Sequence, residues 1–175
     1  MESNRIESLY LGKVQIHHTN NGKFLICSNL RGKELKTILT ILENKRSISH
    51  VTIRFCDFVD IHGNILVQSL SRLRYLEICS INTTATELTA LFRALQGSKD
   101  LAEIVVSQTK LTYVPPEDLA LVLTQVEQVT LEWPNLTLEQ CIQIFTTGKL
   151  KHYQMISEIL PIYNYFQFWM GKKFP

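Results

Sequence analysis

The sequence contains little glycine and proline, and it has no long apolar segment. Its 175 residues include seven glycines and five prolines, which is few for the glycine-rich loops that surround phosphate groups. The motifs G-x-x-x-x-G-K-[ST], G-x-G-x-x-G, G-x-S-x-G and H-E-x-x-H are all absent. The longest apolar runs, such as Leu119–Leu123, are much shorter than the roughly 20 residues that cross a bilayer. These absences argue against a nucleotide-dependent enzyme, a zinc protease and a membrane-spanning helix.

The spacing of the cysteines and the net charge argue against further classes of site and partner. The four cysteines lack the C-x-x-C spacing of zinc sites, and we expect free, mostly buried thiols at Cys27, Cys56, Cys79 and Cys141. Eighteen basic and 16 acidic residues leave a formal net charge of only +2, which predicts neither a nucleic-acid partner nor a membrane surface. The N-terminus lacks the apolar stretch of a signal peptide. We therefore expect a cytoplasmic protein with no metal and no cofactor.

A unit of 25 to 28 residues recurs along the chain. Each unit opens with an apolar-x-apolar segment, and these segments are Phe24–Ile26, Val51–Ile53, Leu76–Ile78, Ile104–Val106 and Val129–Leu131. The steps between their first residues are 27, 25, 28 and 25, and a weaker sixth opening begins near Leu150. The alternation predicts short strands whose alternate side chains point into a core. The inward positions should be Ile26, Val51, Ile53, Leu76, Ile78, Ile104, Val106, Val129 and Leu131.

Helix-period apolar stripes lie between the predicted strands. They are Leu35/Ile38/Leu39/Leu42, Ile65/Leu66/Leu70/Leu73, Leu88/Leu91/Phe92/Leu95, Leu119/Leu121/Val122/Val126 and Leu138/Cys141/Ile142/Phe145. Helix starts are indicated by capping boxes at Thr84–Glu87 and Thr137–Gln140 and by Pro115 and Pro116. No unit can cover its own apolar faces, so neighbouring units should stack. The pattern predicts an α/β solenoid of about five to six strand-loop-helix units, with a parallel sheet on one face and helices on the other.

An ordinary doubly wound α/β sheet is the alternative. The near-constant period argues against it, and so do the short, half-polar strands, because buried central strands contain continuous Val/Ile runs.

At these residues the chain resembles the leucine-rich-repeat superfamily, in particular its ribonuclease-inhibitor-like class of long repeats. That class includes the repeat regions of NOD-like receptors and of F-box substrate receptors. The resemblance extends from Lys23 to His152, although the asparagine of the pattern L-x-x-L-x-L-x-x-N is mostly missing. Cys56 and Asn82 are the candidates for its role of bonding the loop backbone. The resemblance implies a non-catalytic module for protein binding, either an adaptor or the recognition part of a larger receptor.

The two ends of the chain differ from the repeats. Residues 1–22 should form a further strand or an N-terminal cap, and residues 23–152 the solenoid. Residues 153–175 form an aromatic tail that contains Tyr163, Phe168 and Trp169. We interpret this tail as a C-terminal cap, because a solenoid end needs a cover. An inter-domain or partner contact is the alternative, since Tyr and Trp are frequent in interfaces.

The outward strand positions should form a concave binding surface. Alternation assigns to it Thr52, Arg54, Glu77, Cys79, Val105, Ser107, Thr130 and Glu132. We expect this surface to bind a protein or peptide partner, and we expect no catalytic and no metal-binding residues. Two alternatives stay open at this point. One is an enzyme with an unrecognised pocket, and the other is a structural element that associates with itself.

Overall fold

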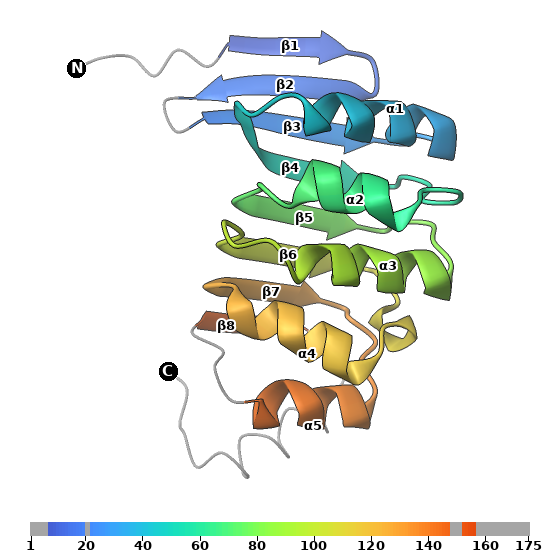
Figure 1. Cartoon of the computed structure of the whole chain (residues 1–175), viewed down its shortest axis with the longest axis vertical. Helices are drawn as coiled ribbons and strands as arrows, with labels where there is room; N and C mark the ends of the chain where they lie inside the picture. The colour runs from blue at the N-terminus through green and yellow to red at the C-terminus, as the bar shows by residue number, and fades with distance from the viewer. Residues whose placement is uncertain (1–6, 20–21, 148–151, 157–175) are drawn as a thin grey trace, which may run out of the picture.

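A computed structural model describes residues 7–19, 22–147 and 152–156, and in them strands alternate with helices along most of the chain (Figure 1). The strands are β1 Glu7–Leu11, β2 Val14–Thr19, β3 Gly22–Ser28, β4 Ile48–Arg54, β5 Tyr75–Cys79, β6 Glu103–Ser107, β7 Gln128–Glu132 and β8 His152–Ile156. The helices are α1 Gly32–Glu43, α2 Gly63–Leu70, α3 Ala85–Leu95, α4 Pro116–Gln125 and α5 Leu138–Thr146, with a 3-10 turn η1 at Leu111–Tyr113. The prediction of an α/β fold is confirmed.

The described strands form one sheet in which they lie side by side in chain order, from β1 to β8. Neighbouring strands from β3 to β8 pair in parallel. Strand β2 pairs antiparallel with both β1 and β3, so β1 and β2 extend the sheet at its N-terminal edge. The helices cover the same side of this sheet, one beside the next (Figure 1). A short connection through a helix returns each strand to its neighbour, which explains the parallel pairing.

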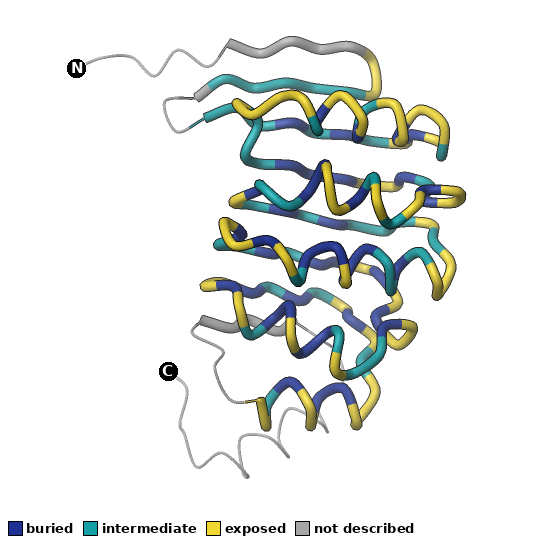
Figure 2. The backbone as a smooth tube through the Cα atoms, in the orientation of Figure 1, coloured by how far each residue is buried: buried dark blue, intermediate teal, exposed yellow. Residues whose placement is uncertain are grey.

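The core lies between the sheet and the helices, and alternate side chains of each strand contribute to it. Figure 2 shows buried residues along each of the strands β3 to β7, at alternate positions in β3, β5 and β7. Eight of the predicted inward residues are buried, namely Val51, Ile53, Leu76, Ile78, Ile104, Val106, Val129 and Leu131. Their neighbours on adjacent strands are in register, so each core layer continues from strand to strand.

The inward assignment of Ile26 is wrong. Leu25 pairs with Val51 and Cys27 pairs with Ile53, so Leu25 and Cys27 are the buried side chains of β3. Ile26 pairs with Thr52 on the opposite face. The run from Phe24 to Cys27 is apolar at every position, so the sequence pattern does not show which alternate residues face the core. The parallel register with β4 decides this instead.

The two predicted capping boxes are present in the structure, at the starts of α3 and α5. Thr84 Oγ1 accepts a hydrogen bond of 3.3 Å from the backbone N–H of Glu87, and Thr137 Oγ1 accepts one of 3.1 Å from that of Gln140. In return, the Glu87 carboxylate and the Gln140 amide oxygen accept from the backbone N–H groups of Thr84 and Thr137. These contacts satisfy N–H groups that a helix start otherwise leaves without partners.

The apolar stripe predicted for α5 is partly wrong. Leu138 and Ile142 are 62% and 48% exposed, and Ile144 is buried in their place. Gln140 is also buried, and its amide nitrogen donates hydrogen bonds to the backbone oxygens of Leu111 (2.7 Å) and Val114 (2.6 Å). A polar side chain therefore anchors α5 to the turn before α4, and the helix rotates accordingly. Leu121 of the stripe predicted for α4 is likewise 51% exposed.

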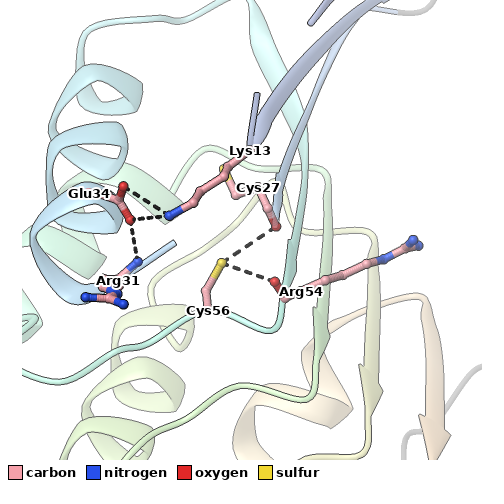
Figure 3. Close-up of polar contacts among 6 residues, drawn as sticks. All are labelled: Lys13, Cys27, Arg31, Glu34, Arg54 and Cys56. Carbon is pink, nitrogen blue, oxygen red and sulfur yellow. Dashed lines mark hydrogen bonds and ion pairs between the residues drawn. The ribbon is translucent and has the colours of Figure 1, made fainter. Parts of the chain in front are cut away.

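The backbone-bonding role predicted for Cys56 and Asn82 is confirmed for one residue only. Cys56 is buried, and its thiol points toward the carbonyl oxygens of Arg54 (3.3 Å) and Cys27 (3.7 Å), as Figure 3 shows. Thr109, which the sequence analysis did not assign, donates in the same way to the Ser107 oxygen at 3.0 Å. The Asn82 side chain is exposed and donates instead to the Asp57 carboxylate.

All four cysteines are free, as expected, and Cys79 alone among them is only half-buried. Burial raises the pKa of the Cys27 thiol to about 12 and also raises the pKa of the Cys56 thiol. These two thiols are therefore inert components of the core.

The N-terminal strands are joined to the first helix by an ion pair. Lys13 lies in the β1–β2 turn, and its ammonium lies 3.0 Å from a Glu34 carboxylate oxygen (Figure 3). The same carboxylate accepts a hydrogen bond of 2.8 Å from the Arg31 backbone, and these two contacts lower the pKa of Glu34. Of residues 153–175, which were predicted to form the aromatic tail, residues 153–156 belong to strand β8, and the others lie outside the described residues.

Candidate functional site

The candidate site is the side of strands β4–β7 that faces away from the helices, which we call the open sheet face. Its twelve side chains form three rows across the strands. The first row is His50, Tyr75, Glu103 and Gln128, the middle row is Thr52, Glu77, Val105 and Thr130, and the last row is Arg54, Cys79, Ser107 and Glu132. The eight residues predicted for the binding surface are the middle and last rows, so the structure brings all of them together.

The eight predicted residues are not equally accessible. Thr52 and Ser107 point outward but are only 8% exposed, since longer neighbours cover them. The Arg54 side chain is 46% exposed, whereas that of Glu77 is 15% exposed. Figure 3 shows the Arg54 side chain extending away from the sheet, on the side opposite to Cys56. A partner would therefore contact the longer side chains of the face, with the small ones beneath them.

A hollow of about 460 Å³ lies on this face at the carboxyl ends of the strands. Its lining residues are Arg54, Phe55, Glu77, Cys79, Val105, Ser107 and Glu132. Six of these were assigned to the surface from the sequence, and Phe55 was not. The hollow is open rather than enclosed, which suits a side chain or a peptide segment better than a small substrate that must be shielded from water.

Glu77 is the centre of a hydrogen-bond network on the face. One of its carboxylate oxygens accepts from Arg54, with 3.0 Å to Nε and 2.7 Å to Nη2. The other accepts from the hydroxyl groups of Tyr75 (3.0 Å) and Thr52 (3.3 Å). Burial, followed by the nearby Glu77 charge, raises the pKa of the Tyr75 phenol. The network fixes both long side chains and presents a rigid surface.

The charges of the open sheet face are mostly negative. It carries Arg54 together with Glu77, Glu103 and Glu132, one positive and three negative groups, which is a formal charge of −2. Arg54 and Glu77 neutralise each other. Among the described residues, no side chain forms an ion pair or hydrogen bond with the half-buried carboxylates of Glu103 and Glu132. The face is thus acidic, although the whole chain has a formal charge of +2.

An aromatic row that was not predicted from the sequence continues the first row of the face onto β3. The ring of His50 lies 4.2 Å from that of Phe24 and 5.9 Å from that of Tyr75, measured between centroids. Burial and the nearby Arg74 lower the pKa of His50, so this imidazole is neutral at pH 7. The sequence contained an indication of this row, because each of the three residues lies one position before an inward residue. The row could be recognised only once it was known that Leu25 and Cys27 are the inward residues of β3.

A second missed feature is a row of residues with left-handed backbone, each directly after a strand. The row consists of Asn29, Phe55, Ser80, Gln108 and Trp133, with φ between 49° and 57°. The first four donate their backbone N–H to the last residue of the next strand, at 2.9–3.0 Å. Such a backbone is rare for bulky residues and costs about 1–2 kcal/mol relative to glycine. The repeat therefore imposes this conformation on each unit.

Phe55 and Trp133 are the two large aromatic residues of this row, and both are exposed. Their exposed fractions are 56% and 40%. Neither burial in the core nor backbone preference explains an aromatic residue at these positions. Backbone strain together with an exposed anchor residue is typical of binding sites.

The described residues contain neither a metal-binding cluster nor a membrane-spanning helix. In residues 7–19, 22–147 and 152–156, no group of three or more His, Cys, Asp or Glu side chains is placed to hold a metal ion. Within the same residues, every helix is too short or too polar to cross a bilayer. Asp57 and Asp60 lie in the loop between β4 and α2, where Asp57 accepts from the backbone of Val59 and Asp60 donates its N–H to Glu87.

Comparisons with known proteins add no assignment. No family model, no curated protein and no solved structure matches this chain at a significant level.

Proposed function

We propose that this chain is a leucine-rich-repeat-like solenoid that binds a protein or peptide partner on its open sheet face. The observation that carries the proposal is the hollow on that face. Six of its seven lining residues are ones that the repeat pattern assigns to a binding surface. Neighbouring repeats each contribute one strand to it, which is how repeat proteins build extended binding surfaces.

Three regularities support the solenoid. Successive strands lie in chain order. A left-handed residue follows strands β3 to β7 at the equivalent position. Cys56 and Thr109, three residues after the second inward residue of their strands, both bond a strand carbonyl. This is the position of the signature asparagine in leucine-rich repeats, so a thiol and a hydroxyl replace it here.

Recognition suits the face better than catalysis does. The carboxylate of Glu77 already accepts four hydrogen bonds, from Arg54, Tyr75 and Thr52, so its oxygens are occupied by neighbouring side chains. A general acid or base needs free access to a substrate. The fixed Arg54–Glu77 pair instead offers rigid polar contacts at little entropic cost.

The helical side of the molecule offers a matched control. Arg93 pairs with Asp118 at 2.8 Å, much as Arg54 pairs with Glu77 at 2.7 Å, and in both pairs the arginine is exposed and the carboxylate largely covered. Affinity capture from lysate of the source cells should be done with the wild-type chain, Arg54→Ala and Arg93→Ala. Quantitative mass spectrometry should show a partner whose captured amount changes several-fold with Arg54→Ala and not with Arg93→Ala. Equal capture by all three chains would place the interface elsewhere and contradict the proposal.

Self-association is a second candidate, favoured by the exposed apolar side chains of α5. Leu138 and Ile142 lie on the last described helix, where a further repeat would pack. Light scattering at increasing concentration should detect a dimer if this surface pairs with a second copy. Leu138→Ser should then shift the molecule to a monomer.

A further inference from the structure

The partner that fits the open sheet face is defined by the charges and rings around the hollow. We infer that it is an extended peptide segment that crosses the hollow from Phe55 to Trp133 and inserts an arginine or lysine side chain beside Glu132, at the Trp133 end. This inference rests on the proposed function and adds the chemical class of the partner.

The charge distribution favours a basic partner. Arg54 is neutralised by Glu77 at 2.7 Å, so the charges that a partner meets are the carboxylates of Glu103 and Glu132. Both are half-buried on the open sheet face, and no described residue pairs with them. A carboxylate that is partly removed from water and lacks a cation is a strong site for a guanidinium or ammonium group. An acidic or phosphorylated segment would be repelled by the same groups.

The two exposed rings favour a cation over a purely apolar side chain. Phe55 follows β4 and Trp133 follows β7, so three strand spacings separate their backbones, which is roughly 14 Å. An extended segment of about four residues covers that length. Aromatic faces attract Lys and Arg, and Trp attracts them most strongly. Glu132 lines the hollow, and Trp133 is the next residue in the chain, so Trp133 borders the β7 end of the hollow.

The left-handed backbone explains how these rings reach the surface. In a continuing strand, the residue after Arg54 would point toward the core. At φ 54° for Phe55 and φ 53° for Trp133 the chain turns instead, and both side chains are exposed. The two other residues between them in this row, Ser80 and Gln108, are polar, and their side chains form a hydrogen bond of 2.6 Å. The two residues between the rings therefore carry neither a charge nor a ring.

The test is selection of a phage-displayed library of random dodecapeptides on the full-length wild-type chain, followed by fluorescence anisotropy with the enriched peptides. We expect enriched peptides to share a central Arg or Lys. Their affinity should fall as the salt concentration rises, because the Debye length shortens to a few ångströms near molar ionic strength. Glu132→Gln should weaken binding about three- to tenfold, and replacing the central basic residue of the peptide by Gln should have a similar effect. Glu139→Gln, an exposed acidic residue of α5, is the matched control and should change nothing.

Glu132→Arg makes the test two-sided, because selection on this variant should enrich acidic peptides instead. Thermal unfolding of each variant ensures that losses of binding are compared among folded proteins. Enriched peptides that lack a basic preference, yet lose binding in Arg54→Ala or Phe55→Ala, would overturn this inference and leave the proposed function intact. Peptides whose binding none of the sheet-face variants changes would overturn both.

Discussion

The left-handed residue after each of the strands β3 to β7 gives the sharpest test of how neighbouring units fix one another's backbone. Phe55 has φ 54°, a conformation that costs an L-residue about 1–2 kcal/mol relative to glycine. Replacing Phe55 by Gly and by Ala removes the ring in both cases, so the loss of its contacts cancels in the comparison. Only the alanine variant keeps the Cβ that makes this backbone unfavourable.

The expected difference follows from two opposing terms. Glycine relieves about 1–2 kcal/mol in the folded state, and its greater freedom in the unfolded chain costs about 0.4–1 kcal/mol. Phe55→Gly should therefore be more stable than Phe55→Ala by about 1 kcal/mol, or a few degrees in Tm. The same pair at Lys36, an exposed position in the middle of α1, should give the opposite order by about 1 kcal/mol.

Urea unfolding followed by circular dichroism, fitted with one shared m-value, measures these differences directly. Equal stability of the two Phe55 variants, or a more stable alanine variant, would show that the left-handed turn is not imposed by the repeat. In the peptide assay the two variants should lose affinity alike, because they lose the same ring. A glycine variant that binds as well as wild type would remove Phe55 from the binding surface.

Three further predictions concern the stability of the fold. Gln140→Leu removes a buried amide that donates hydrogen bonds to two backbone oxygens of the turn before α4. It should lower the free energy of unfolding by about 2–4 kcal/mol in a urea titration. A loss below about 1 kcal/mol would contradict this. The pKa of Tyr75 is raised above its ordinary value of 10.0 by burial and by Glu77, so the folded chain keeps this proton longer than the unfolded chain. The stability that results is fully present below pH 10 and is lost as the pH rises beyond it, and Tyr75→Phe should show a shallower loss in alkaline urea titrations; an unchanged slope would refute the assignment. Gly32→Ala places a Cβ 2.6 Å from the backbone oxygen of Val59, so it should destabilise the chain by about 1–3 kcal/mol despite the helix preference of alanine; calorimetry that finds it more stable would exclude this close approach.

The order of the strands and the position of the helices could be predicted from local pattern. Apolar alternation at Val51, Leu76, Ile104 and Val129 identified four parallel strands, because a half-buried strand repeats its environment every two residues. The capping box at Thr84 was equally readable, since it depends only on contacts within one helical turn.

The errors occur where local pattern is ambiguous and neighbours decide. In β3 every residue from Phe24 to Cys27 is apolar, so only pairing with β4 shows that Ile26 faces outward. In α5 the spacing of Leu138 and Ile142 is correct for a buried stripe. The rotation of the helix instead follows from the bonds of Gln140 to a turn 26–29 residues earlier.

The residues of the candidate surface also divide into those that the sequence predicts and those that only the tertiary structure reveals. Alternation was enough to place Arg54, Glu77 and Glu132 on one face, because a strand sends successive side chains to opposite sides. The exposed rings of Phe55 and Trp133 could not be anticipated, because a left-handed turn in a bulky residue has no local preference to reveal it. That turn exists because the neighbouring repeat accepts the backbone N–H of Phe55, and such a bond forms only when the units are stacked.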